Sequence, residues 1–253
     1  MTNRLASPTI LDPATQSPTT HSVASAVHTH GGDVCRHALF APVHYERDYA
    51  YPLIVWLHSP GGNEGQLPRI MPQLSMRNYV AVAPRGTADL DPDADEPRCR
   101  WTQQPDHVYL ATERVFDCMA LAGRKFHIRR ERVFLAGAGC GGTMALRIAL
   151  AHPDRFAGAI SLGGELPRGR MPLANVNAAR RLPLLLMAGL TSQRYPQSRV
   201  NDDLRLLHSA GIAVTLRLYP FGDEIAPLML GDVNRWVMQQ IFPESTSTPA
   251  DAE

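Results

Sequence analysis

The chain lacks three features that would point to particular partners: an excess of one charge, a long apolar run and paired cysteines. Its 25 Lys and Arg residues are balanced by 24 Asp and Glu residues, for a formal net charge of +1. So small a net charge provides no field to gather nucleic acid or an anionic membrane, and we expect neither as a partner. No segment reaches the roughly 18 apolar residues of a membrane span. The N-terminal stretch also lacks the apolar run of about 7–15 residues typical of a secretory signal, so we expect a cytoplasmic protein.

The cysteines are scattered rather than paired. Cys35, Cys99, Cys118 and Cys140 form no CxxC pair, and no cysteine–histidine group has the spacing of zinc ligands. Scattered cysteines of this kind are typical of free thiols in a reducing compartment. We expect no metal and no other cofactor.

What is present is enough apolar material for one folded domain. Hydrophobic residues make up 44% of the 253 residues and charged residues 19%. A sizeable core is therefore expected, and global disorder is not. Residues 1–32 are rich in Ser, Thr, Pro and Ala and are predicted to be a disordered tail, as are residues 244–253. The remaining residues, 33–243, are predicted to form a single domain.

Short apolar runs alternate with segments of helical period along this domain. The predicted strands are residues 37–42, 51–58, 79–86, 132–137, 156–164, 182–189 and 214–220. The predicted helices are residues 106–126, 141–153, 198–211 and 226–242. This alternation predicts an α/β fold with a mostly parallel central sheet and helices on both faces. In such sheets ligands bind beyond the carboxyl ends of the strands, so the loops there are candidates for a site.

One of these loops is a sharp turn between a strand and a helix. The stretch LAGAGCGGTMAL spans residues 135–146 and carries small residues on both sides of the turn, Gly137, Gly141 and Gly142. Such a turn is typical of the elbow that exposes a nucleophile in many hydrolases. The residue at its centre is Gly139, which has no side chain, and Cys140 follows it.

Four blocks in this order resemble a known family. They are YPLIVWLHSPGGNEGQL, RVFLAGAGCGGTMALRIAL, LPLLLMAGLTSQRYP and VTLRLYPFGDEI. Together they are similar to the α/β-hydrolases, and more narrowly to the phospholipase/carboxylesterases, a group that includes acyl-protein thioesterases and feruloyl-esterase-like enzymes. The resemblance covers roughly residues 36–242 and implies the α/β-hydrolase fold.

The resemblance also implies where a catalytic triad would lie. The family elbow reads G-x-S-x-G and places the nucleophile at Gly139. The family pattern H-G-x-x-D-x-x-x-P places the acid at Ser192, and Y-P-x-G-H-E places the histidine at Asp223. All three residues depart from the family pattern, while the glycines and prolines around them match it. The resemblance therefore implies the scaffold of an esterase without its reactive side chains.

The oxyanion hole is implied by the same resemblance. One donor is the backbone N–H after the nucleophile, which Cys140 retains. The other comes from the family pattern H-G-x-G, whose third position falls on Pro60 in this chain. Proline has no backbone N–H to donate. A shift of one residue in this loop would return the role to Gly61 or Gly62, and that alternative stays open.

These positions lead to two hypotheses. The favoured one is a pseudohydrolase that does not catalyse and instead binds a small ester-like ligand or a protein partner. The alternative is a hydrolase of carboxylic esters or thioesters with Cys140 as nucleophile, assisted by His58, His107 or Asp223. A helix N-terminus would lower the pKa of such a thiol. Ser59 and Ser161 lie near the expected sheet edge, but neither lies on an elbow.

Overall fold

The computed structural model describes residues 23–30, 33–90, 98–169 and 173–242. Its strands are β1 (Val23–His30), β2 (Asp33–Phe40), β3 (Tyr51–Leu57), β4 (Val80–Pro84), β5 (Ala88–Asp89), β6 (Cys99–Arg100), β7 (Ile128–Ala138), β8 (Gly158–Leu162), β9 (Leu184–Gly189) and β10 (Val214–Tyr219). Its α-helices are α1 (Leu67–Leu74), α2 (Pro105–Lys125), α3 (Cys140–Ala151), α4 (Val176–Ala179), α5 (Gln197–Ser209) and α6 (Pro227–Ile241). Two 3₁₀ turns, η1 (Glu64–Gln66) and η2 (Pro153–Arg155), complete the described elements.

The main sheet has eight strands in the order β1-β2-β4-β3-β7-β8-β9-β10. From β4 to β10 every neighbouring pair is parallel, and β2 pairs antiparallel with both β1 and β4. The predicted mostly parallel sheet is therefore confirmed. Because the parallel strands point the same way, the loops after β3, β7, β9 and β10 meet at one edge of the sheet.

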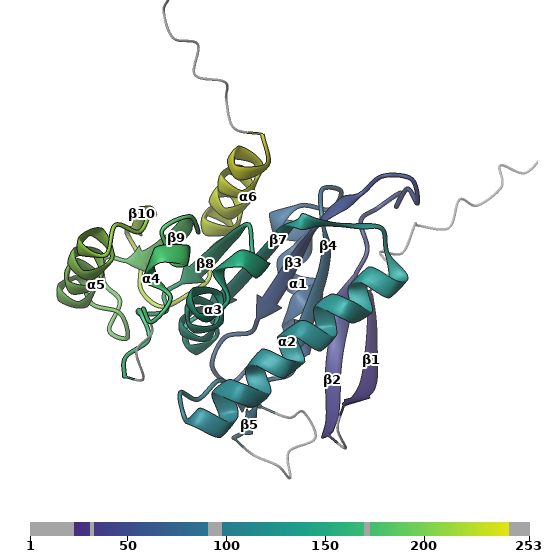
Figure 1. The fold of residues 1–253 in the computed structure, drawn as a ribbon, viewed down its shortest axis with the longest axis horizontal. Coiled ribbons are helices and arrows are strands. Elements are labelled where there is room, and N and C mark those ends of the chain that lie inside the picture. The colour runs from purple at the N-terminus through teal and green to yellow at the C-terminus, as the bar shows by residue number, and fades with distance from the viewer. Residues whose placement is uncertain (1–22, 31–32, 91–97, 170–172, 243–253) are drawn as a thin grey trace, which may run out of the picture.

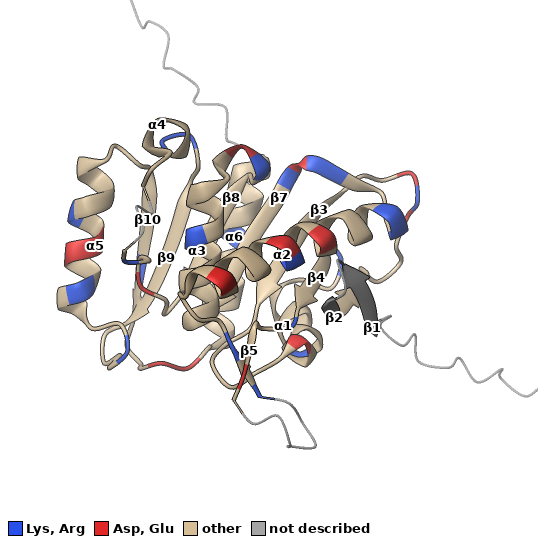
Figure 2. Ribbon diagram, turned by 60° about the horizontal axis from the view of Figure 1, so that its bottom comes forward, with Lys and Arg blue, Asp and Glu red and all other residues tan. Residues whose placement is uncertain are grey.

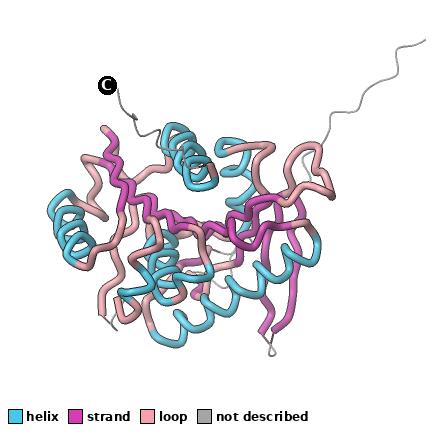
Figure 3. Tube along the Cα trace, turned by 45° about the horizontal axis from the view of Figure 1, so that its top comes forward, coloured by secondary structure: helices cyan, strands magenta, loops and turns pink. Residues whose placement is uncertain are grey.

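Helices cover both faces of this sheet (Figures 1 and 3). On one face, α1 and α6 contribute side chains such as Met71, Leu74 and Trp236 to the core. On the other face, α2 and α3 contribute Val115, Met144 and Ile148. Burial on both faces explains why the parallel strands read as continuous apolar runs.

Strand β3 shows how the two layers share one strand. All seven of its residues are buried. Leu53, Val55 and Leu57 belong to the core under α2 and α3, whereas Ile54 and Trp56 belong to the core under α1 and α6. Successive side chains of a strand point to opposite faces, and here both faces are apolar.

The structure adds the short elements β5, β6 and α4 to those expected, and it differs more substantially near the N-terminus and after β3. Val23–His30, expected in the N-terminal tail, form β1 and pair with β2 along its whole length. Leu67–Leu74, to which no element was assigned, form α1, with Pro68 in its first turn and Pro72 inside it. Proline is a helix breaker in most interiors, which hid the helical spacing of the buried residues. Of the predicted N-terminal tail, 1–32, residues 1–22 and 31–32 lie outside the described residues, as does the whole predicted C-terminal tail, 244–253.

None of the helices within the described ranges is long and apolar enough to cross a membrane.

Candidate active site

The turn between β7 and α3 has the geometry of a nucleophile elbow. β7 ends at Ala138, α3 begins at Cys140, and Gly139 between them has φ 53° and ψ −122°. This positive φ is a strained conformation for residues with a side chain, and such strain is a feature of the elbow. The strand and the helix thus meet at the residue that the sequence pattern selected.

Small residues beside the turn are required by how closely its backbone segments approach. A Cβ atom built on Gly137 would lie 2.5 Å from the backbone carbon of Gly141, and one on Gly141 would lie 2.3 Å from the carbonyl oxygen of Leu57. Both distances are far inside van der Waals contact. The first turn of α3 can therefore lie against β3 and β7 only with glycine at these two positions.

Pro60 lies directly over Gly139. A Cβ atom on Gly139 would lie 2.8 Å from Pro60 Cδ and 3.1 Å from Pro60 Cγ. A proline ring is fixed to its own backbone and cannot swing aside like the end of a long side chain. The ring therefore occupies the space that any side chain at position 139 would enter. The sequence indicated only that Pro60 lacks an N–H; the steric contact was not foreseen.

The structure brings three of the predicted site residues into one small cleft. Pro60, Gly139 and Asp223 line a cavity of about 30 Å³. Ligand-binding pockets for small molecules usually measure about 300–1000 Å³, whereas about 10–15 Å³ holds a water molecule. The cleft formed by these described residues therefore has room for little more than water.

Ser192 joins this cleft through a hydrogen bond. Its hydroxyl donates to Asp223 Oδ1 at 2.5 Å and accepts from the Tyr195 backbone N–H at 2.9 Å. Arg194 Nε lies 3.9 Å from Asp223 Oδ2. The loops after β9 and β10 are thus connected by a serine and a carboxylate. Neither group is an imidazole that could take a proton from a nucleophile near neutral pH.

Cys140 lies apart from that cleft. Its sulfur accepts a hydrogen bond from the Trp101 backbone N–H at 3.5 Å, and no histidine within the described ranges hydrogen-bonds to it. Burial raises the pKa of the Cys140 thiol and outweighs the nearby backbone N–H groups that lower it. The N–H groups at the start of α3 lower this pKa as expected, but the larger effect of burial was not foreseen. At neutral pH the group is therefore a protonated thiol, which is a poor nucleophile.

Both ring nitrogens of His58 form hydrogen bonds with the surrounding backbone. Its Nδ1 lies 2.9 Å from the carbonyl oxygen of Ser59, and its Nε2 accepts from the Gly86 backbone N–H at 2.9 Å. Burial lowers the pKa of this imidazole to about 4. His58 is therefore a neutral structural residue with no ring nitrogen left for a proton transfer. His107 lies in the first turn of α2, half-buried, with its Nδ1 unpartnered.

The alternative oxyanion donors and the two nearby serines are also engaged. Gly61 N–H donates to the Cys99 carbonyl at 2.9 Å and Gly62 N–H to the Ser59 carbonyl at 3.0 Å. Ser59 Oγ accepts from Gln66 Nε2 at 2.8 Å. Ser161 is completely buried, and its hydroxyl donates to the Gly164 carbonyl at 2.7 Å. Within the described residues, no group of three His, Cys, Asp or Glu side chains could hold a metal ion.

The strand order, the elbow and the position of the cleft define an α/β-hydrolase fold. Solved structures with this architecture include a carboxylesterase from Mesorhizobium loti, with a TM-score of 0.66 and 20% identity over 85% of this chain and 98% of that one. A Bacillus cereus carboxylesterase gives a TM-score of 0.64 and 18% identity over 81% of this chain and 94% of that one. At such identities the likeness concerns the fold.

Residues 113–241, about half of the chain, match the phospholipase/carboxylesterase family, and the chain belongs to that family. A curated relative is the "Putative esterase NocK" of Nocardia uniformis subsp. tsuyamanensis, 31% identical over 141 residues. That match covers 54% of this chain and 39% of the relative. The chain thus spans well under half of the length of this relative.

The contact between Pro60 and Gly139 predicts a coupled effect on stability. We expect Gly139→Ser to lower the free energy of unfolding by about 2–4 kcal/mol, because it adds a strained φ and a clash. Pro60→Ala removes the two ring carbons that would clash, so the double variant should recover at least about 1 kcal/mol of that loss. Urea unfolding of the two single variants and the double variant measures this coupling. Strictly additive losses would contradict the contact.

The buried His58 predicts a loss of stability in acid. The unfolded state takes up a proton near pH 6.5, whereas the folded state resists protonation down to about pH 4. The contribution of His58 to the free energy of unfolding is therefore complete above pH 6.5 and is lost as the pH falls. We expect the free energy of unfolding to drop by about 2–3 kcal/mol between pH 7 and pH 4.5. Urea unfolding at both pH values checks this. His58→Gln should reduce the dependence on pH, whereas the exposed His208→Gln should retain it.

Proposed function

We propose that this protein is a pseudohydrolase, a member of the phospholipase/carboxylesterase family that does not hydrolyse esters and acts by binding. One observation carries the proposal. The residue at the centre of the elbow is Gly139, and the Pro60 ring fills the space that a nucleophilic side chain would occupy. A missing side chain could be the only change in an otherwise open site, but here the space itself is filled.

The surrounding groups support the same conclusion. The cleft beside the elbow measures about 30 Å³, too little for the acyl and alcohol parts of an ester. Pro60 cannot donate an N–H, and the N–H groups of Gly61 and Gly62 are already bonded to carbonyl oxygens. Loss of one oxyanion donor costs about 3–4 kcal/mol of transition-state stabilisation. The Ser192–Asp223 pair supplies no imidazole in place of the family histidine.

The alternative with Cys140 as nucleophile has less support. A cysteine hydrolase needs a thiolate and a base within hydrogen-bonding distance. Burial raises the pKa of Cys140, and its sulfur faces the Trp101 N–H rather than a histidine. Both nitrogens of His58 are used by the backbone. Asp223 hydrogen-bonds to Ser192 in the other cleft.

A binding role would explain an esterase fold that does not catalyse ester hydrolysis. The two solved structures described above are named as carboxylesterases and the curated relative as an esterase. We propose that this chain shares their framework and has exchanged turnover for recognition of a ligand or a protein. Since the cleft at the elbow is nearly filled, the binding surface should lie elsewhere on the fold.

Hydrolysis of p-nitrophenyl acetate and butyrate tests the proposal. We expect the wild-type protein and the Cys140→Ala and Cys140→Ser variants to release nitrophenolate at the same background rate. An authentic carboxylesterase serves as the positive control. Turnover that disappears in Cys140→Ala would establish the cysteine mechanism. Turnover that survives in both variants but is lost in Ser59→Ala or Ser161→Ala would assign it to a serine and equally refute catalytic silence.

A further inference from the structure

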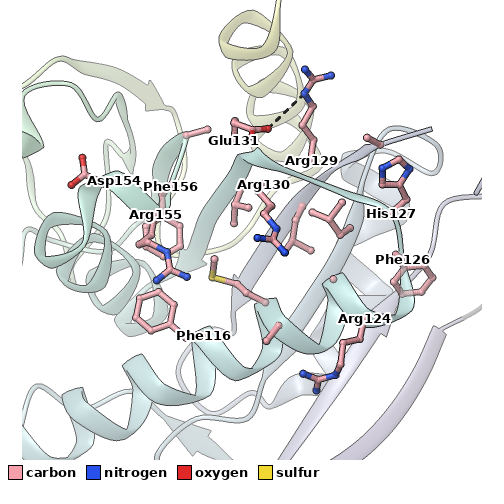
Figure 4. Close-up of a pocket in the computed structure, with 18 residues that line it drawn as sticks. Phe116, Arg124, Phe126, His127, Arg129, Arg130, Glu131, Asp154, Arg155 and Phe156 are labelled. Atoms are coloured by element: carbon pink, nitrogen blue, oxygen red, sulfur yellow. Dashed lines mark ion pairs between the residues drawn. The ribbon is translucent and has the colours of Figure 1, made fainter. Parts of the chain in front are cut away.

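A large open cavity lies at the opposite edge of the sheet from the elbow. Its volume is about 1370 Å³, and it is lined where β3, β7 and β8 begin and by one side of α2 (Figure 4). The elbow and its cleft follow the carboxyl ends of β3, β7, β9 and β10. Because these strands are parallel, the two cavities lie at opposite ends of the sheet. The volume is ample for a small organic ligand.

The floor of this cavity is apolar. Phe116 and Met119 project from α2 and are half-buried, and Phe156 follows η2 and is 7% exposed. The rings of Phe116 and Phe156 are stacked, with centroids 6.3 Å apart. Gly123 on the same helix leaves further open space, since a Cβ atom there would meet no atom within 4 Å. This floor offers a surface for an aliphatic chain or a ring.

Two arginine side chains lie over that apolar floor. Figure 4 shows the guanidinium groups of Arg130, from β7, and Arg155, from η2, projecting over the cavity. Arg155 Cζ lies 4.7 Å from the centre of the Phe116 ring, a cation–π contact that holds the guanidinium group above the floor. Figure 2 shows Lys and Arg gathered where β7 begins and where α2 ends.

The acids at the cavity do not neutralise these two arginines. Glu131 Oε2 lies 3.7 Å from Arg129 Nε, so this carboxylate forms an ion pair with a third arginine. Asp154 points away from Arg130 and Arg155 in Figure 4. Among the described residues, no carboxylate forms an ion pair with either of the two guanidinium groups. An apolar floor below two uncompensated cations has the chemistry to hold an amphipathic anion.

We propose that this cavity binds a small amphipathic anion, with its carboxylate or phosphate held by Arg130 and Arg155 and its apolar body on Phe116, Met119 and Phe156. The proposal names the ligand class for the binding role proposed above and rests on that role. It does not depend on the cleft at the elbow. Both anionic head groups present two or more oxygen atoms that a guanidinium group can bind with paired hydrogen bonds.

The acidic C-terminal segment of the chain is a poorer match for this floor. Residues 243–253, PESTSTPADAE, carry carboxylates but no aromatic or long aliphatic side chain. This segment follows Phe242, whose ring lies 5.5 Å from Arg132 Cζ on β7. Its carboxylates are a competing source of anionic groups, so the experiment has to distinguish the segment from a free ligand.

Calorimetric titration of the full-length protein with four probes of equal chain length tests the proposal. The probes are decanoate, decyl phosphate, decanol and decyltrimethylammonium, each below the concentration at which it aggregates. We expect at least one of the two anions to bind at one site, at least tenfold more tightly than decanol, and the ammonium probe not to bind. Tighter binding of decyl phosphate than of decanoate would identify a phosphate ligand, and the reverse order a carboxylate. Equal binding of anion and alcohol, or binding of neither anion, would overturn the proposal.

Substitutions locate the binding site. Arg130→Gln and Arg155→Gln should each weaken binding of the anion about tenfold. Gly123→Trp should abolish it by filling the cavity. Arg205→Gln on α5 and Gly231→Trp on α6 are the matched controls, because a Cβ at Gly231 also meets no atom within 4 Å, and both should bind like wild type. An equal loss in the control variants, or no loss in the cavity variants, would refute the site.

The C-terminal segment is tested in the intact chain. Combined Glu244→Gln, Asp251→Asn and Glu253→Gln should leave the affinity for the anion within about twofold. A tightening of tenfold or more would show that the segment itself occupies the cavity and would overturn the proposal. The esterase assay reports independently on catalytic silence, so a failure of this site and a failure of the proposed function give different results.

Discussion

The fold around the site depends on the close approach of the first turn of α3 to β3 and β7. A Cβ on Gly141 would lie 2.3 Å from the Leu57 carbonyl, so the helix can start here only without a side chain at this position. This requirement concerns backbone and packing, not chemistry. It holds whether or not the residue at the turn can attack a substrate, so this packing is compatible with glycine at position 139.

The residues around the cleft that depart from the family pattern are sterically compatible with one another. Glycine at position 139 makes room for the Pro60 ring, and the ring leaves no room for a larger residue. Ser192 and Asp223 keep a hydrogen bond between the loops after β9 and β10. His58 holds the loop after β3 by bonding to Ser59 and Gly86. We propose that these contacts preserve the shape of an esterase site that has lost its reaction, while binding has moved to another edge of the sheet.

Much of the fold could be predicted from the sequence, because the central parallel strands, such as β3, β4 and β9, are continuous apolar runs and the helix pattern between the strands is clear. α1 was missed because its two prolines argue against a helix. β1 was missed because its composition resembles a tail, although Gly31–Gly32 before β2 is a hairpin signal.

The candidate site was predictable only in part. The resemblance to the family motifs selected Gly139, Ser192 and Asp223, and the structure joins the last two by a hydrogen bond. The contact of Trp101 with Cys140 could not be foreseen, because it depends on how a loop 39 residues away folds back. The net rise in the pKa of Cys140 could not be foreseen either: a helix start is visible in a sequence, but burial of the thiol is not.

The central claim is that no residue of this esterase scaffold can act as a nucleophile, and reaction with a fluorophosphonate probe tests it most directly. Such probes form a stable bond with an activated serine, and intact-mass spectrometry detects the added mass on the full-length protein. We predict no added mass after incubation of the folded protein, under conditions that label an authentic carboxylesterase completely. Stoichiometric labelling at a single serine, abolished by prior unfolding of the protein, would contradict it.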